Sequence, residues 1–424
     1  MTEGVGTRRP LRRVAGPTRR RIGAGWRGAA LAATVGLLAG CSGNAPESTP
    51  KSTDPFLFSD STLPVVTESL TPPTAPDGTI NLRAAGCPDP IVIEADGPPS
   101  LYQSAWFALM GGTRASTAGR AYIDDLLDPN TGKTTGTQLE LRFPNAASTD
   151  FGTRLSDPLV LGALASTEEQ LVNAVRTPTV AVVVPWAQSA RMLYWDPQTY
   201  PLTQSIPDLG MQKVKVRVRD RGIWLSYLVS AGLLSDDEVV VTSATDDLVT
   251  AFVADRGRVA SEGSALVDMV TANRAFGRSV AFQLVANAGY DPYPASLVVR
   301  PSVLTDQAPC LRAFVPLVQA AQVGFVRNSA KTVAVIARVG REQGVTSLGS
   351  ASALTAQARR AVALGLIANS GNGVLGSVDA AKMRRLLKAL TPIAKRRGTP
   401  IPLSVKADAL LDNQFINRLM TLET

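Results

Sequence analysis

The sequence of 424 residues contains no histidine and only three cysteines. The missing histidine excludes His-based acid–base catalysis, Ser–His and Cys–His nucleophiles, and histidine metal ligands. Three cysteines are too few for a Cys₄ zinc site. We therefore expect no His-based catalysis and no metal or other cofactor held by such ligands. Catalysis by Lys, Asp or Glu is the formal alternative.

Most of the chain also lacks an excess of basic over acidic residues, although the formal net charge of the whole sequence is +8. Residues 1–40 contain eight arginines and one acidic residue, Glu3, which leaves 35 basic and 34 acidic residues from Cys41 onward. The basic balance therefore belongs to the amino-terminal segment, and the sequence gives no support for a nucleic-acid partner.

The amino-terminal segment lacks an apolar run long enough to span a membrane. Its run Ala29–Gly40 has twelve residues, whereas a transmembrane helix needs about 20. The run follows the arginines and ends in Leu38-Ala39-Gly40-Cys41, and this order of charged, apolar and small residues is typical of an export signal. The last four residues resemble the bacterial lipobox, in which the cysteine is acylated.

We therefore predict that residues 1–40 are a lipoprotein signal peptide and that Cys41 carries a lipid anchor. The alternatives are an ordinary secretory signal with an incidental cysteine, or a signal anchor, and Arg8-Arg9 leaves twin-arginine export open. Residues 41–85 are rich in Pro, Ser and Thr. Such a composition cannot bury enough apolar surface to order the chain, so we predict a disordered tether.

The rest of the chain alternates between strand-like and helix-like segments, which indicates an α/β fold. Val180–Val184 is an uninterrupted apolar run, typical of a parallel strand buried on both faces. Residues 213–219 predict a strand, 223–234 a helix and 239–242 another strand. The turn Asp220-Arg221-Gly222 joins the first strand to the helix. Ligands bind at such turns because backbone N–H groups and the helix dipole converge there.

Four basic residues alternate with valines along the strand at 213–219. Lys213, Lys215 and Arg217 are interpreted as a solvated face or as guards of a sheet edge. Arg219 and Arg221 lie at the strand end and in the turn, where their guanidinium groups are able to hold an anion through two parallel hydrogen bonds.

Seven short motifs follow one another between Trp186 and Phe415. They are 194–201 (YWDPQTYP), 208–210 (DLG), 289–293 (GYDPY), 309–311 (PCL), 318–322 (VQAAQ), 371–373 (GNG) and 412–415 (DNQF). Their order behind a lipobox resembles a solute-binding lipoprotein of a bacterial ABC importer, in the nitrate/sulfonate/taurine and thiamine-pyrimidine-precursor group. The first half departs from that group: its relatives usually carry Trp and acidic residues after the first strand, and this chain has ADGPP at 95–99.

The resemblance implies a type II periplasmic-binding-protein fold. Such a fold has two α/β lobes, mixed sheets flanked by helices, and two crossover segments, with ligand in the cleft between the lobes. Lobe 1 would be discontinuous, at 86–195 and 300–424, and lobe 2 would span 200–295. Cys87 and Cys310 would then lie in the two halves of lobe 1. In an oxidising compartment we expect them to form a disulfide worth roughly 5 kcal/mol, with two free buried thiols as the alternative.

The same resemblance implies a set of ligand-binding residues around the cleft. They are Arg219, Arg221, Tyr227, Ser243, Ser261 and Glu262 in lobe 2, Tyr290 and Tyr293 at the second crossover, and Asp96, Tyr102 and Trp186 in lobe 1. Ser261 and Glu262 are expected in a loop. Each residue also has a structural interpretation: the aromatic rings would pack in the core or hinge, Ser243 would belong to a turn, and Glu262 would brace arginines.

The functional hypothesis is a monomeric receptor anchored by lipid at the outer face of the bacterial cell membrane. It would capture a small anionic or aromatic solute by lobe closure and deliver it to a permease and its ATPase, without making or breaking a bond. The alternative is an envelope lipoprotein that kept this fold and acts through a protein partner without transporting a ligand. Some relatives make a pyrimidine with histidines, and this chain has none.

Overall fold

The computed structural model describes residues 71–112, 120–144, 150–243 and 245–423. The predicted signal peptide, Cys41 and tether residues 42–70 lie outside the described residues. These features therefore stay predictions from the sequence.

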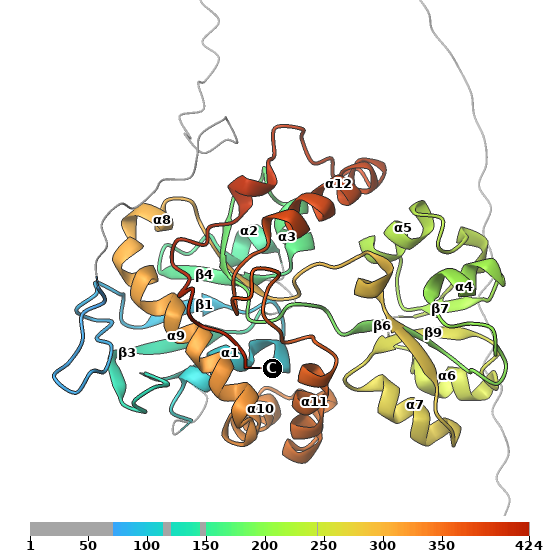
Figure 1. The fold of residues 1–424 in the computed structure, drawn as a ribbon, viewed down its shortest axis with the longest axis horizontal. Helices are drawn as coiled ribbons and strands as arrows, with labels where there is room; N and C mark the ends of the chain where they lie inside the picture. The colour runs from blue at the N-terminus through green and yellow to red at the C-terminus, as the bar shows by residue number, and fades with distance from the viewer. Residues whose placement is uncertain (1–70, 113–119, 145–149, 244, 424) are drawn as a thin grey trace, which may run out of the picture. The chain divides into compact units, whose positions relative to one another are not determined.

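The first of two sheets has six strands in the order β2-β3-β1-β4-β11-β5 (Figure 1). Their bounds are β1 (Ile91–Glu94), β2 (Ala121–Leu127), β3 (Thr134–Arg142), β4 (Val160–Ala165), β5 (Val180–Val183) and β11 (Ser296–Val299). β1 pairs in parallel with β3 and β4, whereas β2 and β11 run antiparallel to their neighbours. β5 is buried as expected, but its ladder, which it forms with β11, is antiparallel and not parallel as predicted. Its other side makes a single parallel bridge between Ala181 and Leu411.

The second sheet has five strands in the order β10-β6-β9-β7-β8. Their bounds are β6 (Arg191–Trp195), β7 (Val216–Val218), β8 (Val239–Val241), β9 (Ala260–Ser264) and β10 (Ala281–Leu284). β7 is parallel to both β8 and β9, and β6 is antiparallel to β9 and β10. Both sheets are therefore mixed.

The predicted strand–helix–strand unit is present as β7, α5 (Ile223–Ser230) and β8. Lys213 and Lys215 precede β7 and are exposed, as predicted. Arg217 lies within β7, between β9 and β8, so it does not guard a sheet edge. Arg217 instead forms an ion pair with Asp255 at 2.5 Å. The helix ends at Ser230, four residues before the predicted end at 234.

Helices cover both faces of each sheet (Figure 1). One face of the first sheet packs on α1 and α9, and the other packs on α2, α3 and α12. Beside the second sheet, α4 and α5 lie on one face and α6 and α7 on the other. The bounds are α1 (Ser104–Leu109), α2 (Phe151–Arg154), α3 (Thr167–Val172), α4 (Ile206–Met211), α6 (Leu248–Ala254), α7 (Asp268–Phe276), α8 (Val303–Asp306), α9 (Ala308–Arg327), α10 (Ala330–Glu342), α11 (Ala351–Ala363) and α12 (Ala380–Arg396).

α9 is the one helix among the described residues that is long and apolar enough to cross a membrane. Its Leu311, Phe314 and Val318 are fully buried against the first sheet and α1. The Phe314 ring also lies 6.2 Å from the ring of Trp106 in α1. α9 is therefore the central core helix of the first lobe.

The two crossover segments are fixed by the change of sheet between consecutive strands. β5 belongs to the first sheet and β6 to the second, and β10 belongs to the second and β11 to the first. The crossovers therefore occupy 184–190 and 285–295. The predicted limits at 195 and 300 are too late, because Tyr194 and Trp195 are buried in β6 and β11 begins at Ser296.

The folded body begins before residue 86, so the predicted tether is wrong for residues 71–85. Leu82 is fully buried, and its N–H donates to the carbonyl of Thr135 in β3 at 2.9 Å. Asp77 forms an ion pair with Lys133 at 2.8 Å. This segment is ordered by contacts with a strand far along the chain, which its composition does not reveal.

The predicted disulfide between Cys87 and Cys310 is confirmed, with 4.8 Å between the Cα atoms. Cys87 precedes β1 and Cys310 lies in α9. The bond closes a sequence separation of 223 residues. It therefore joins the two chain segments that build the first lobe.

Candidate functional site

A cavity of about 270 Å³ lies where the two crossover segments meet. Ser166 and Glu168 enter it from the start of α3, just after β4. Segments around β6 and β10 and the second crossover complete the wall, through Ser189, Arg191, Val285, Ala286, Tyr290, Pro292 and Pro294. Strands of both sheets therefore lead into one cavity, and strand ends that switch direction or sheet are where α/β folds hold ligands.

Glu168 is the half-buried acidic group of this cavity. The Ser166 side chain caps α3 by accepting the N–H of Glu169, which fixes the first turn of the helix. The carboxylate of Glu168 accepts a hydrogen bond from the hydroxyl of Tyr290. Burial raises the pKa of Glu168, and this hydrogen bond opposes the rise. Burial and the neighbouring carboxylate also raise the pKa of Tyr290, so its hydroxyl stays protonated as a donor.

Arg191 is the basic group of the cavity and is held on two sides. Its guanidinium pairs with Glu262, and it lies 5.0 Å from the centroid of the Trp224 ring. The second carboxylate oxygen of Glu262 accepts the backbone N–H of Arg219 at 3.0 Å. Glu262 therefore braces Arg191 and the end of β7 together, which matches its structural interpretation.

Two tyrosines connect α5 to the second crossover. The rings of Tyr227 and Tyr290 lie 5.5 Å apart between centroids. Gly289 has a φ of +97°, and a Cβ there would lie 2.5 Å from the Tyr227 hydroxyl oxygen. Glycine is therefore required at this position, both for the backbone conformation and for the close approach of the ring.

Tyr102 and Trp186 support the first crossover from behind the cavity. The Tyr102 hydroxyl accepts the N–H of Ala190 at 2.9 Å. Trp186 is fully buried, stacks edge-on against Tyr102 at 4.8 Å, and donates through Nε1 to Ser104 at 3.2 Å. These aromatic residues hold the neighbours of Arg191 in place and do not line the cavity.

Of the predicted site residues, only Tyr290 belongs to the cavity lining. Arg219, Tyr227 and Glu262, described above, lie outside the lining, and so do five further residues. Asp96 accepts a hydrogen bond from Gln103 at 3.1 Å, and burial raises its pKa. Ser243 is exposed in a turn, and its hydroxyl bonds that of Thr245 at 3.0 Å. The remaining three are Arg221, Ser261 and Tyr293.

Arg221 is exposed and pairs with Asp236 in a different groove. Ser261 is fully buried within β9, so the predicted loop at 261–262 is wrong: this segment pairs with β6 and β7 in the sheet interior. Tyr293 is buried, and its hydroxyl accepts the N–H of Asp379 at 2.9 Å.

Arg191 and Glu168 were missed by the sequence analysis. Arg191 opens a buried apolar strand directly after the first crossover, and a single charged residue in that position was a usable signal. Glu168 follows the apolar strand β4 within the run Ser166-Thr167-Glu168-Glu169, which reads first as a helix start. The sequence does not show which of these two glutamates lines the cavity. In the structure Glu168 lines it, whereas Glu169 pairs with Arg154 at 2.6 Å.

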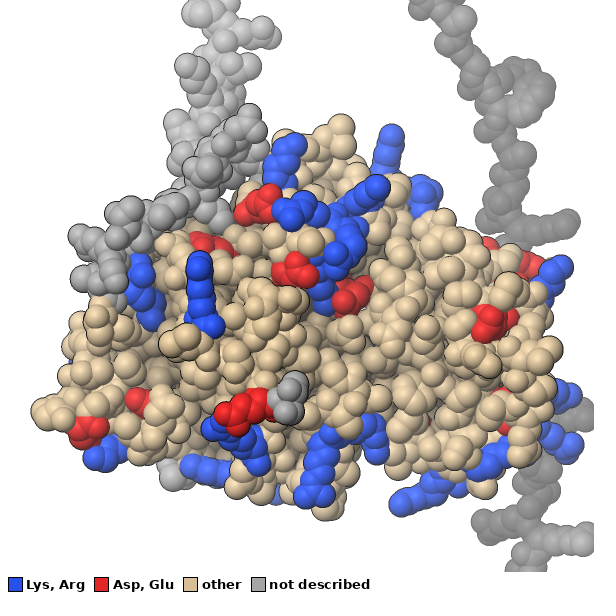
Figure 2. All heavy atoms as spheres, viewed as in Figure 1, with Lys and Arg blue, Asp and Glu red and all other residues tan. Residues whose placement is uncertain are grey.

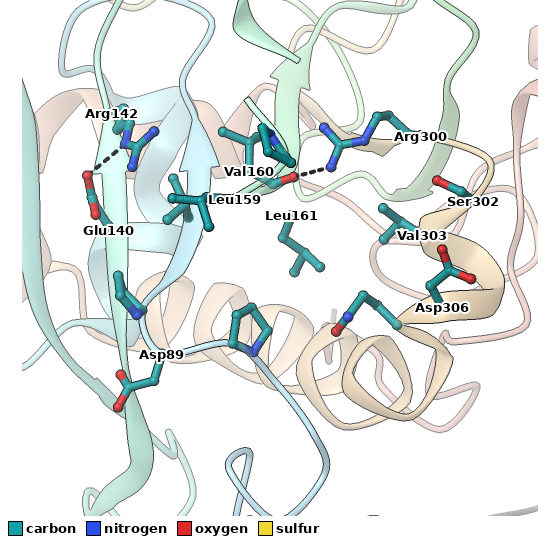
Figure 3. A pocket seen from close by; sticks show the side chains of 15 residues that line it. Asp89, Glu140, Arg142, Leu159, Val160, Leu161, Arg300, Ser302, Val303 and Asp306 are labelled. Carbon is teal, nitrogen blue, oxygen red and sulfur yellow. Dashed lines mark hydrogen bonds and ion pairs between the residues drawn. The ribbon is translucent and has the colours of Figure 1, made fainter. Parts of the chain in front are cut away.

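A larger cavity of about 460 Å³ lies beside the first sheet, between β1, β3 and α8 (Figure 3). Its two arginines already have protein partners. Arg300 donates to the carbonyl oxygens of Leu155 and Val160, and Arg142 pairs with Glu140 at 2.7 Å. The lining of this cavity comes from the first lobe alone, so a ligand there would not contact both lobes, and the candidate site is the cavity at the crossovers. Among the described residues no group of His, Cys, Asp or Glu side chains is arranged to hold a metal ion.

The arrangement of two mixed sheets, flanking helices and two crossovers defines a two-lobed periplasmic-binding-protein fold. Comparison with solved structures gives the same fold. The periplasmic aliphatic sulphonate binding protein SsuA from Escherichia coli is 10% identical, with a TM-score of 0.51 over 80% of this chain and 94% of that chain. At this identity the likeness concerns the fold alone.

Further solved structures match with lower scores. The ligand binding component of an ABC-type import system from Staphylococcus aureus, with zinc bound, is 11% identical, with a TM-score of 0.47 over 77% of this chain and 98% of that chain. The periplasmic nitrate-binding protein NrtA from Synechocystis PCC 6803 is 11% identical, with a TM-score of 0.44 over 76% of this chain and 84% of that chain. No family model and no curated protein sequence matches the chain.

Proposed function

We propose that this protein is the solute-binding component of an ABC importer. It is held at the outer face of the bacterial cell membrane by a lipid on Cys41, and it delivers its solute to a permease and an ATPase. The observation that carries the proposal is the cavity at the two crossovers, where Glu168, Arg191 and Tyr290 meet. A solute there contacts both lobes only when they are closed, and so it stabilises the closed state.

The cavity supports a small polar solute. Its volume of about 270 Å³ is just below the range of drug-sized pockets. The Glu168 carboxylate accepts hydrogen bonds and the Arg191 guanidinium donates them, while the ring of Tyr290 offers an apolar edge. We infer a solute that carries an anionic or accepting group toward Arg191 and a donating group toward Glu168. The aliphatic sulphonate named for the Escherichia coli neighbour has such an anionic group.

The residue proposed to bind an anion is therefore Arg191, in place of Arg219 and Arg221. Arg221 pairs with Asp236 outside the cavity, and Arg219 contributes a backbone N–H to Glu262. Arg191 takes over the role that the sequence analysis gave to these two arginines. Because Glu262 already neutralises Arg191, a solute anion shares or replaces that partner.

The proposal is tested by thermal unfolding against a panel of small sulfonates, carboxylates and zwitterions. A solute at a hundred times its dissociation constant adds about 2.7 kcal/mol to the free energy of unfolding. Glu168→Gln should reduce this gain for solutes with a donor group, because a neutral amide oxygen is a weaker acceptor than a carboxylate oxygen. Asp208→Asn is the matched control, since it makes the same change on a carboxylate outside the cavity and should leave the gain unchanged.

The second candidate function is an envelope lipoprotein that acts through a protein partner. Two observations favour it. Glu168 and Arg191 already have protein partners, in Tyr290 and Glu262, and the loop at 95–99 departs from the pattern of the relatives. Thermal unfolding with the solute panel and copurification of the exported chain distinguish the two functions. If no member of the panel raises the unfolding temperature and the exported chain copurifies with an envelope protein, the transport proposal fails.

A further inference from the structure

A second groove lies between α5 and the carboxyl end of α12, and it shares no residue with the cavity at the crossovers. It has a volume of about 440 Å³. Its lining comes from α5 and its neighbours on the side of the second sheet, and from α12 on the side of the first: Arg221, Leu225, Ser226, Val229, Ser230, Asp236, Arg396 and Arg397.

Three guanidinium groups line this groove against a single carboxylate. The ion pair of Arg221 with Asp236 has exposed fractions of 50% and 67%, so it contributes little and is easily exchanged. Arg397 donates to the carbonyl of Arg221 at 2.6 Å and has no carboxylate partner among the described residues. Arg396 forms no ion pair with any residue that the structure describes. The groove therefore carries an uncompensated positive charge.

The basic character extends along α12. From Ala380 to Ala407 the sequence holds eight basic residues and no acidic one. On the face shown in Figure 2, Lys and Arg side chains gather where Figure 1 places α12. Like charges packed this closely repel one another, and a bound anion relieves that repulsion.

We propose that the groove binds a phosphate group, and that the bound anion joins α5 to α12. A guanidinium donates two parallel hydrogen bonds to such an oxyanion, and three guanidinium groups line this groove. Arg221 belongs to the segment before α5, and Arg396 belongs to the end of α12. The anion therefore bridges elements that pack on different sheets. This site is separate from solute capture and does not depend on it.

The primary test is isothermal titration calorimetry of the full-length chain with inorganic phosphate, at an ionic strength held constant with sodium chloride. The wild type should show saturable binding. Arg396→Glu should weaken it about tenfold or more, because it removes charge-assisted hydrogen bonds. Lys388→Glu changes the same charge on an exposed residue of α12 outside the groove. It should change the affinity by less than about twofold, because salt screens a distant charge.

A second variant tests whether the anion contacts both Arg221, before α5, and Arg396, at the end of α12. Arg221→Ala should weaken phosphate binding as Arg396→Glu does, since both side chains would contact the anion. An unchanged affinity in Arg221→Ala would overturn the bridge. Absence of saturable phosphate binding in the wild type, or equal losses in Arg396→Glu and Lys388→Glu, would overturn the site.

A phosphate group reaches this groove either as a dissolved anion or as a lipid headgroup. Sedimentation with phosphatidylglycerol vesicles, against phosphatidylcholine vesicles, distinguishes the two sources. Sedimentation that free phosphate reverses and Arg396→Glu abolishes assigns the site to the headgroup. Calorimetric binding without such sedimentation assigns it to the free anion. Because no solute is present in either experiment, failure of the phosphate site leaves the proposed transport function untouched.

Discussion

Glu168 holds its carboxyl group beside Tyr290, and burial raises its pKa above the ordinary value of 4.5. The folded protein therefore binds this proton more tightly than the unfolded chain does. The resulting stability is fully present below pH 4.5 and is lost as the pH rises through the raised pKa. Glu168→Gln cannot ionise, so its stability relative to the wild type should increase from pH 4.5 to neutrality.

Urea denaturation at a series of pH values measures this difference. Asp208→Asn is the control with the opposite sign, because hydrogen bonds from Gln204 and Ser205 lower the pKa of Asp208. Its stability relative to the wild type should change only at lower pH. A difference between Glu168→Gln and the wild type that stays constant with pH would contradict the assigned environment of Glu168.

Among the cavity residues, we expect replacement of Arg191 to lower the free energy of unfolding most. Arg191→Met keeps an apolar stem over Trp224 but removes the partner of Glu262, whose side chain is 7% exposed. Breaking a buried pair costs 3–5 kcal/mol, and the partial exposure of Arg191 reduces this to about 2 kcal/mol. Chemical denaturation measures the loss. The double variant with Glu262→Gln should recover part of it, and a double variant as unstable as the sum of the single changes would count against the pairing.

At the scale of elements, α12 is joined to both crossovers through one side chain. The Lys382 ammonium donates to the carbonyl of Ala187 in the first crossover at 2.6 Å. It also pairs with Asp291 in the second crossover at 2.8 Å and lies 4.1 Å from the centroid of the Tyr293 ring. A single residue of the first lobe therefore fixes the two segments about which the lobes would move.

Lys382→Met should lower the free energy of unfolding by about 3 kcal/mol, because Asp291 is left without its cation. Hydrogen exchange at 185–190 and 289–294 should accelerate in the same variant, since both crossovers lose a contact. Lys388→Met is the matched control on the exposed face of α12. Unchanged exchange in both segments would show that Lys382 does not anchor the crossovers.

The positions of helices and strands were predicted from the sequence better than the directions in which the strands pair. The strand–helix–strand unit at β7, α5 and β8 follows from local periodicity and is present. The antiparallel pairing of β5 depends on β11, more than a hundred residues further along, and local pattern has no access to it. The predicted site shows the same division: Tyr290 and Glu262 meet near Arg191, whereas Arg221 turns toward Asp236, because a turn residue follows whichever partner the fold supplies.

At the scale of the whole molecule, the disulfide dominates the connection between the ends of the first lobe. Its sequence separation of 223 residues corresponds to roughly 5 kcal/mol in the chain-entropy model. Replacing both Cys87 and Cys310 by alanine should therefore lower the free energy of unfolding by about 2–5 kcal/mol. Denaturation of the wild type with and without a reductant gives the comparison, and the double variant should be insensitive to reductant. Equal stability of the wild type and the double variant would contradict this role.

The position of Cys87 also decides how the protein bears a mechanical load. Cys87 lies between the amino-terminal segment and β1, and its sulfur is bonded to α9 in the core. A pull on the amino terminus first strains the hydrogen bonds of Leu82 and its neighbours, and then reaches the disulfide. The covalent bond passes the force to α9, so β1 and the strands beside it carry no tension. A force applied through the amino terminus would thus leave the first sheet unstrained.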